Sequence, residues 1–279
     1  MLRRSIRVRS VARPITFLSD YGADDEFAGV CRAVIARIAP GATVIDLTHG
    51  VRRHAVREGA TILANALPYA PPGVHLAVVD PGVGTPRRAV AVRAGLEERL
   101  LVGPDNGLLW PAVERLGGAV EAVDVSLSRL RLEPISATFH GRDIFAPVAA
   151  HLAQGAPLSE AGEQIPAESL VTLQASQPAI RPDHVLAHVI SVDRFGNAVL
   201  DLADHHLPAS GLQMGRSAAI ETQGQSHEAV FTLTFADVDA GELLLYVDSY
   251  KSVALAVNRG SAAAELNLAP GDEVVLRPL

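Results

Sequence analysis

The residues best placed to do chemistry are an acidic and a basic side chain at the two ends of one short loop. Asp80 follows an apolar run at residues 74–79 and precedes Pro81-Gly82, which cannot continue a central strand. Arg87 comes seven residues later and precedes a second apolar run at 89–92. If the two runs pair as strands, the carboxylate and the guanidinium meet across the loop. They could then handle a water molecule, or they could form a loop-closing ion pair with a purely structural role.

Two other polar side chains are candidates for the same region. Asp20 follows an apolar run at 14–18, where a carboxylate could accept two hydrogen bonds from a ribose diol or could instead cap its own turn. His140 precedes Gly141, whose missing side chain would let a ligand approach closely. The alternative for His140 is a hydrogen-bonded histidine at a helix start.

The elements that must position these residues alternate in type. Apolar runs at 14–18, 43–47 and 74–79 predict strands, and the helical spacing of apolar side chains predicts helices over 24–38 and 54–67. This alternation is typical of a parallel sheet covered on both faces, whose strands end at one common edge. We therefore expect an α/β N-terminal domain with a mostly parallel sheet and a site at that edge.

The pattern changes in the last third of the chain. Short apolar or alternating runs, separated by Gly, Pro, Asp and Asn turns, predict a smaller antiparallel β-barrel domain. These runs cover 184–192, 197–202, 229–235, 242–248, 252–257 and 272–277. We expect a loose basic tail at 1–13, the α/β domain at 14–170, a linker at 171–182 and the barrel domain at 183–279. The tail lacks the apolar segment of a secretory signal, and a transit peptide is the alternative.

Composition limits the classes of function. A net charge of −7 argues against a nucleic-acid partner, because phosphate binding needs a basic surface. No apolar run reaches the ~18 residues of a membrane span, so no membrane segment is expected. The ten histidines form no common metal motif, so no metal site is expected. The single cysteine, Cys31, lies on the apolar side of a predicted helix, which favours core packing and a reducing, cytoplasmic setting.

One turn of the second domain carries another group of polar and aromatic side chains. Gly196-Asn197 predicts a hairpin, with Asp193 and Phe195 just before it. Phe195 could stack on a planar ring while Asn197 reads the edge of that ring, or Phe195 could be a core residue of the hairpin. Phe235 and Ser249 allow the same two interpretations.

Six short stretches along the chain form an ordered set. They are Phe17-Leu-Ser-Asp20-Tyr-Gly, Val79-Asp80-Pro-Gly-Val-Gly-Thr-Pro-Arg87, Pro104-Asp-Asn-Gly-Leu-Leu, Phe139-His140-Gly-Arg-Asp, Asp193-Arg-Phe195-Gly-Asn197 and Tyr246-Val-Asp-Ser249-Tyr. Each stretch alone is a weak signal. Together, over nearly the whole chain from residue 14, they resemble the S-adenosyl-L-methionine (SAM) hydroxide adenosyltransferase family, also called DUF62, which is related to SAM-dependent fluorinases and chlorinases.

The resemblance implies an N-terminal α/β domain, a C-terminal β-barrel and a homotrimer with the ligand between neighbouring subunits. It implies hydrolysis of SAM to adenosine and L-methionine by attack of an activated water or hydroxide at C5′, with no metal or other cofactor. Asp80, Arg87 and His140 match the water-handling triad of the family. Substrate-binding roles are implied for Asp20, at the ribose diol, and for Asp25, Asp193, Phe195, Asn197, Phe235 and Ser249.

Two other functions remain open from the sequence. A SAM-dependent halogenase has the same scaffold, but halogenating relatives usually carry an aromatic residue at the position of Asp80 and another residue at that of His140. A carboxylate in that pocket would also repel a halide. The remaining hypothesis is a non-catalytic protein that binds SAM or adenosine without turnover.

Overall fold

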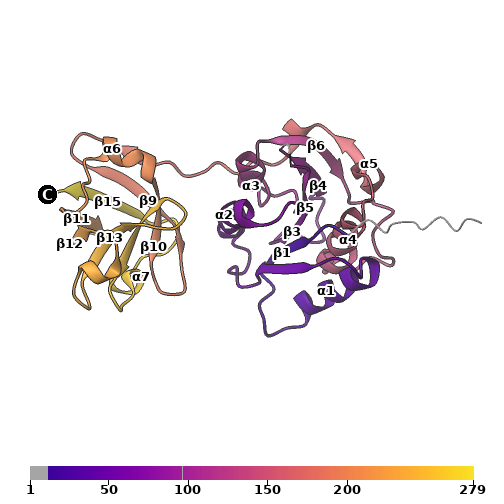
Figure 1. Cartoon of the computed structure of the whole chain (residues 1–279), viewed down its shortest axis with the longest axis horizontal. Helices are drawn as coiled ribbons and strands as arrows, with labels where there is room; N and C mark the ends of the chain where they lie inside the picture. The colour runs from indigo at the N-terminus through magenta and orange to yellow at the C-terminus, as the bar shows by residue number, and fades with distance from the viewer. Residues whose placement is uncertain (1–11, 96) are drawn as a thin grey trace, which may run out of the picture. The chain divides into compact units, whose positions relative to one another are not determined.

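The computed structural model describes residues 12–95 and 97–279, and the chain divides into two compact units after Leu173 (Figure 1). Residues 1–11, which make up most of the expected basic tail, lie outside the described residues. Arg13 is described, and its backbone N–H donates a hydrogen bond of 2.8 Å to the carbonyl of Ala153. Each unit contains one sheet and its own apolar core.

The N-terminal unit is built on a seven-stranded sheet in the order β2-β1-β3-β5-β4-β6-β7. The strands β2, β1, β3 and β5 run parallel, and β4 is antiparallel to both β5 and β6, so β6 shares the direction of the first four. The mostly parallel sheet predicted from the sequence is therefore confirmed. The strands are β1 (Ile15–Ser19), β2 (Val44–Thr48), β3 (Val74–Val78), β4 (Ala89–Ala94), β5 (Arg99–Pro104), β6 (Ala119–Asp124) and β7 (Glu163–Ile165).

Helices cover both faces of this sheet (Figure 1). Successive residues of a strand point to opposite faces, so Phe17 belongs to the core beneath α1 and α4, and Leu18 to the core beneath α2 and α3. Cys31 is fully buried in α1, which confirms its expected role in core packing. The helices and helical turns are α1 (Phe27–Ile38), α2 (Val56–Ala66), η1 (Leu67–Tyr69), α3 (Trp110–Arg115), η2 (Gly141–Phe145), α4 (Ala146–Ala153), α5 (Leu158–Ala161) and η3 (Ala167–Ser169).

The strands on either side of the Asp80–Arg87 loop do not pair with each other. The strand β5 lies between β3 and β4, parallel to the first and antiparallel to the second. The connection from β3 to β4 therefore has to pass the end of β5, where the backbone N–H of Asp105 donates to the carbonyl of Arg88 at 3.0 Å. From the sequence, Asp80 and Arg87 were expected to meet if the strands on either side of their loop paired. In the structure the two side chains meet although β3 and β4 do not pair.

The C-terminal unit is a closed β-barrel of the strands β10-β14-β13-β12-β11-β15-β9, closed by pairing of β9 with β10. All these pairings are antiparallel except that of β12 with β13, so the predicted antiparallel barrel is confirmed. The short strand β8 pairs with β9. The elements are β8 (Ala179–Ile180), β9 (Val185–Val192), β10 (Ala198–Ala203), η4 (Asp204–His206), α6 (Leu207–Ser210), β11 (Ser217–Thr222), β12 (Gln225–Phe231), η5 (Phe235–Asp237), β13 (Leu243–Val247), β14 (Ser252–Val257), α7 (Ala262–Glu265) and β15 (Glu273–Pro278).

The sequence analysis missed β11. Its residues, Ser-Ala-Ala-Ile-Glu-Thr, include two alanines, which are depleted in strands. In the barrel, β11 pairs with β12 on one side and with β15 on the other, and it buries Ala218 and Ile220 in the core. Tertiary pairing therefore overrides a weak local preference at this position.

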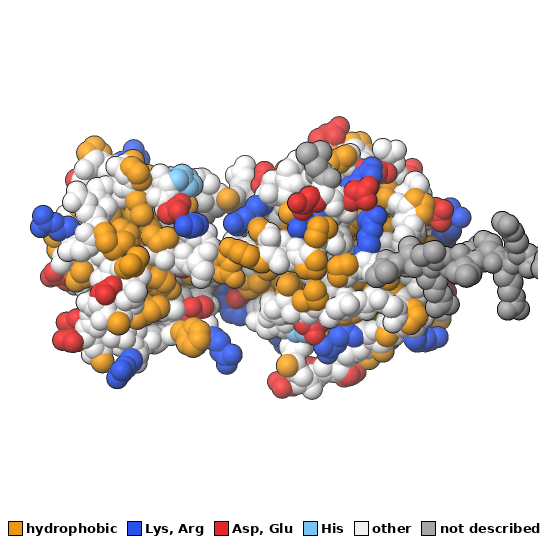
Figure 2. Space-filling view, viewed as in Figure 1, with side chains coloured by type: hydrophobic (Ala, Val, Ile, Leu, Met, Phe, Trp, Pro, Cys, Tyr) orange, Lys and Arg blue, Asp and Glu red, His pale blue; other side chains and the backbone are white. Residues whose placement is uncertain are grey.

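The surface carries charges of both signs. On the face seen in Figure 2, acidic and basic side chains alternate with apolar ones over both units. Among the described residues, no helix is long and apolar enough to cross a membrane.

Candidate active site

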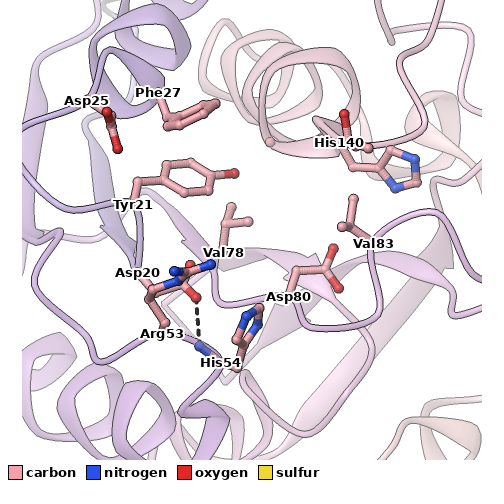
Figure 3. Close-up of a pocket in the computed structure, with 12 residues that line it drawn as sticks. Asp20, Tyr21, Asp25, Phe27, Arg53, His54, Val78, Asp80, Val83 and His140 are labelled. Atoms are coloured by element: carbon pink, nitrogen blue, oxygen red, sulfur yellow. Dashed lines mark hydrogen bonds between the residues drawn. The ribbon is translucent and has the colours of Figure 1, made fainter.

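A pocket of about 360 Å³ opens at the edge of the N-terminal sheet where β1 and β3 end (Figure 3). This volume lies in the range of small-molecule sites. The pocket is lined by residues from the turn after β1, the loops after β2 and β3, and the start of η2. Of the residues predicted from the sequence, Asp20, Asp25, Asp80 and His140 line it. The expected convergence of strand ends therefore produces a real cavity.

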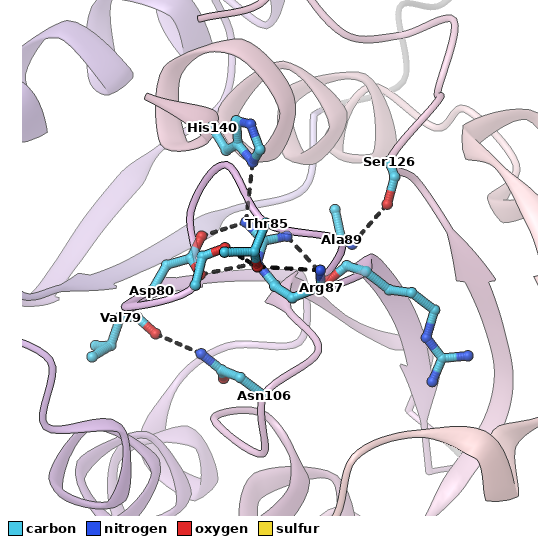
Figure 4. Close-up of polar contacts among 10 residues, drawn as sticks. Val79, Asp80, Thr85, Arg87, Ala89, Asn106, Ser126 and His140 are labelled. Carbon is cyan, nitrogen blue, oxygen red and sulfur yellow. Dashed lines mark hydrogen bonds and ion pairs between the residues drawn. The ribbon is translucent and has the colours of Figure 1, made fainter. Parts of the chain in front are cut away.

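Asp80, Arg87 and His140 form one hydrogen-bonded cluster (Figure 4). Arg87 Nε donates to Asp80 Oδ1 at 2.9 Å, and Arg87 Nη2 forms an ion pair with Asp80 Oδ2. The same Nη2 lies 3.1 Å from His140 Nδ1. The Asp80 and Arg87 side chains are only 6% and 11% exposed. A two-point guanidinium–carboxylate contact of this kind fixes both groups in orientation.

The hydrogen bond from Arg87 assigns the protonation state of His140. A guanidinium has donors only, so His140 Nδ1 must accept, and the proton of the neutral imidazole lies on Nε2. Burial, and then the positive charge of Arg87, lower the pKa of His140, while Asp80 and Asp143 oppose this shift. In this tautomer His140 Nε2 is a donor, and the acceptor of the cluster is the Asp80 carboxylate.

Asp20 is fixed by the loop that follows β2. Its Oδ2 accepts a hydrogen bond of 3.0 Å from the backbone N–H of His54, a residue with a positive φ of 64°. The alternative in which Asp20 caps its own turn does not describe this structure, because the N–H of Gly22 donates to the carbonyl of His49 at 2.8 Å and the N–H of Tyr21 donates to Ser19 Oγ at 3.3 Å. Asp25 lies in the turn before α1, which begins at Phe27 rather than at the acidic pair.

A polar network lies behind the turn that carries Asp20. Ser19 Oγ is 2.7 Å from His49 Nδ1, and the His49 ring packs edge-on against Phe17 with 4.6 Å between ring centroids. His49 Nε2 approaches Asp46 Oδ1 to 3.1 Å, at an angle outside hydrogen-bond geometry, and Asp46 is in turn paired with Arg32. The ends of β1 and β2 are therefore tied together at Ser19, next to Asp20.

The hairpin residues predicted in the second half of the chain lie in the C-terminal unit. Asp193 Oδ1 accepts from the N–H groups of Phe195 at 2.8 Å and Asn197 at 3.0 Å, and Asp193 Oδ2 accepts from Asn197 Nδ2 at 2.8 Å. Phe195 is 71% exposed, so the interpretation of this residue as a core phenylalanine was wrong. The hairpin is thus a rigid turn that presents an aromatic ring to its surroundings.

Phe235 and Ser249 lie on neighbouring turns of the same unit. The Phe235 ring is 40% exposed and contacts the Tyr246 ring at a centroid distance of 4.9 Å. Burial, and then Asp193 and Asp248, raise the pKa of Tyr246 to about 12. Ser249 follows Asp248 in the turn between β13 and β14. Tyr246 thus has both Phe235 and the hairpin carboxylate in its neighbourhood.

Several pocket residues were not predicted from the sequence. They are Tyr21, Phe27, Arg53, His54, Val78, Val83 and Thr138. Arg53 and His54 could have been predicted, because they lie in the loop after β2, and β2 is one of the three strands whose ends were expected to converge at the site. Among the described residues, no cluster of three or more His, Cys, Asp or Glu side chains could hold a metal ion.

Comparison with known proteins agrees with the resemblance read from the motifs. The chain is 50% identical over 262 residues to an (R)-S-adenosyl-L-methionine hydrolase of Salinispora tropica, over 93% of this chain and 96% of that protein. A fluorinase of Nocardia brasiliensis is more distant, at 29% identity over 95% of this chain and 97% of its own length. The crystal structure of an uncharacterized conserved protein from Thermotoga maritima superimposes with a TM-score of 0.88 at 36% identity, covering 94% of this chain and 99% of that one. The N- and C-terminal domain models of the SAM hydroxide adenosyltransferases match residues 15–162 and 187–275. The chain therefore belongs to the SAM hydroxide adenosyltransferase family.

Proposed function

We propose that this protein hydrolyses SAM to adenosine and L-methionine. The observation that carries the proposal is the partly buried Asp80–Arg87–His140 cluster at the same pocket as Asp20, in a chain of this family. The names of its relatives support the same activity and specify the (R) configuration at sulfur. We therefore take the (R) epimer of SAM as the preferred substrate.

The chemistry requires an activated nucleophile and no acid at the leaving group. The sulfonium makes C5′ electrophilic, and the C5′–S bond breaks with its electron pair going to sulfur, so methionine leaves as a neutral thioether. A water oxygen must lie in line with that bond, about 3–3.5 Å from C5′. The SAM cation and water thus give adenosine, methionine and one proton.

In the proposed mechanism each residue of the cluster has a separate part. Asp80 accepts the proton that the water loses as its oxygen bonds to C5′. His140, with its proton on Nε2, donates a hydrogen bond to the water oxygen. Arg87 donates to both residues, which fixes their orientation and favours the negative charge that develops on the oxygen.

Substrate binding is assigned to the remaining predicted residues. Asp20, held by the His54 backbone, accepts hydrogen bonds from the ribose diol, and Asp25 adds a second carboxylate to a pocket that receives a cation. The methionine and adenine contacts are assigned to the C-terminal unit of a neighbouring subunit in the homotrimer proposed below, through its Asp193, Phe195, Asn197, Phe235 and Ser249. No metal and no cofactor take part in this scheme.

The assembly and location are part of the same proposal. We expect a homotrimer in the cytoplasm; the family resemblance supports the first, and a single, buried cysteine fits the second. Size-exclusion chromatography with light scattering tests the trimer, and a dimeric or monomeric mass would refute it.

The experiment that tests the function is incubation with separate (R) and (S) epimers of SAM, at low and high chloride, with products resolved by chromatography. Adenosine and methionine in equal amounts, independent of chloride and lost in Asp80→Ala, are the expected result. A chlorinated nucleoside would make the protein a halogenase. Binding of SAM without either product would leave a binding protein and refute the catalytic role.

A further inference from the structure

Tyr21 is a pocket residue whose chemistry the proposed mechanism does not use. Its ring is fixed by three phenylalanine rings, edge-on to Phe17 and Phe139 at centroid distances of 6.5 and 5.9 Å and tilted against Phe27 at 5.9 Å. Its backbone N–H donates to Ser19 Oγ. The direction of the Tyr21 hydroxyl is therefore set by the fold.

The space for this hydroxyl is provided by Gly141. A Cβ placed on Gly141 would be 1.9 Å from the Tyr21 hydroxyl oxygen and 3.0 Å from Cζ, the ring carbon that bears it. Gly141 lies in η2, in a helical backbone conformation that other residues also adopt. Glycine is thus required at this position because a side chain would clash with the Tyr21 hydroxyl, and not because of an unusual φ. It lies directly after His140.

The hydroxyl is a neutral group directed into the pocket. Figure 3 shows it pointing into the cavity, between Asp20 on one side and Asp80 on the other. Within the described residues it makes no hydrogen bond. Burial, and then the neighbouring Cys31, Asp20 and Asp80, raise the pKa of Tyr21 well above its ordinary value, so the phenol keeps its proton. An O–H donor that faces the pocket and has no protein partner is suited to a ligand acceptor.

The chemistry of the substrate selects the acceptor. If Asp20 holds the 2′,3′-diol and Asp80 faces C5′, the group between them is the ribose ring. Apart from the two diol oxygens, the one acceptor of that ring is the ring oxygen, O4′, which is bonded to the same carbon, C4′, that carries C5′. We propose that Tyr21 is a further substrate-positioning residue, whose hydroxyl donates a hydrogen bond to O4′ of the ribose in the space left by Gly141. This inference rests on the proposed function for the placement of the ribose.

Binding of two nucleosides tests this contact without any turnover. The probes are adenosine and its carbocyclic analogue, in which a CH₂ group replaces O4′, and calorimetry measures their Kd for the wild type and Tyr21→Phe. The change should weaken adenosine about tenfold and leave the carbocyclic analogue within twofold, because only adenosine has the acceptor. Equal weakening of both nucleosides, or of neither, would overturn the proposal. Tyr69→Phe, at a 75% exposed tyrosine outside the pocket, is the matched control and should change neither Kd.

A second comparison tests the role of Gly141. Gly141→Ala should weaken adenosine binding strongly in the wild-type background, where the new methyl group would meet the hydroxyl. In the Tyr21→Phe background the same change should cost several-fold less, since the nearest atom is then a ring carbon 3.0 Å away. An equal loss in both backgrounds would contradict the inferred geometry.

The two proposals can fail separately. A wild type that binds adenosine with the predicted O4′ dependence but releases none from SAM would refute the hydrolase and keep the Tyr21 contact. A wild type that hydrolyses SAM while Tyr21→Phe leaves both nucleoside affinities unchanged would refute the Tyr21 contact and keep the hydrolase.

Discussion

Replacement of Asp80 by asparagine separates the chemical role of this carboxylate from its structural one. Asparagine keeps the shape but cannot take a proton, and removal of a general base typically lowers a rate by about 10²–10⁴-fold. We therefore expect the kcat for SAM hydrolysis to fall at least ~100-fold, with a smaller change in KM. The change also leaves Arg87, only 11% exposed, without its counter-ion. Loss of one partner of a buried ion pair costs about 3–5 kcal/mol, so the free energy of unfolding should fall by roughly 3 kcal/mol.

A neighbouring ion pair provides the matched control. Arg88 Nε donates to Asp105 Oδ2 at 2.9 Å, and the Asp105 side chain is only 4% exposed, but neither residue lines the pocket that Asp20 and Asp80 line. Asp105→Asn should therefore destabilise the protein by a similar amount, measured by urea unfolding, and hydrolyse SAM within a few-fold of the wild type. Adenosine release by each folded variant is followed by chromatography. An Asp80→Asn protein that is folded and within tenfold of the wild-type rate would refute the base assignment, as would an equal loss of activity in Asp105→Asn.

Three other predictions follow from the geometry of the site. Because burial and Arg87 lower the pKa of His140 from 6.5, its neutral form should persist below that pH, and kcat/KM should fall only when the pH drops through the lowered value. Protonation of His140 should also lower the free energy of unfolding, because the unfolded chain binds that proton more readily than the folded one. A pH–rate profile with its acid limb above 6.5 that shifts in His140→Gln would contradict this sign. Asp20→Asn should raise KM for SAM about tenfold or more with a smaller change in kcat, since charge-assisted hydrogen bonds contribute ~1.5–3 kcal/mol; a fall in kcat alone would place Asp20 in the chemistry instead. His49→Asn keeps a hydrogen-bonding group near Ser19 Oγ whereas His49→Leu does not, so KM should rise more in the leucine variant, and equal KM values would show that the network next to Asp20 is dispensable.

The local patterns of the chain were sufficient to predict the architecture. Apolar runs of strand length alternate with helical spacing over the first 80 residues, and this alternation is typical of a parallel sheet covered by helices. The same argument correctly placed Asp20 and Asp80 at one edge, because the ends of parallel strands coincide. It failed for β11, where two alanines carry little strand preference and the pairing partners are distant in sequence.

Only some residues of the candidate site could be predicted from the sequence, and there is a physical reason why the others could not. Asp80, Arg87 and His140 were identified by residue type, spacing and resemblance, and the structure joins them in one cluster. Tyr21 and His54 were missed, because their roles depend on where other segments approach them. Nothing within residues 19–22 indicates that Gly141 leaves room for the Tyr21 hydroxyl, and nothing near His54 indicates that its N–H meets Asp20.

The sequence by itself determined the two kinds of domain, the edge of the sheet that carries the site, and the family. These features follow from short-range information: periodicity, turn residues and motifs. Only the tertiary structure decided that β5 separates β3 from β4, and that Arg87 pairs with Asp80 while the adjacent Arg88 pairs with Asp105. Two successive arginines are equivalent in composition and charge. Their partners differ because the loop that carries Asp80 meets Arg87, whereas Arg88 meets Asp105 just beyond the end of β5.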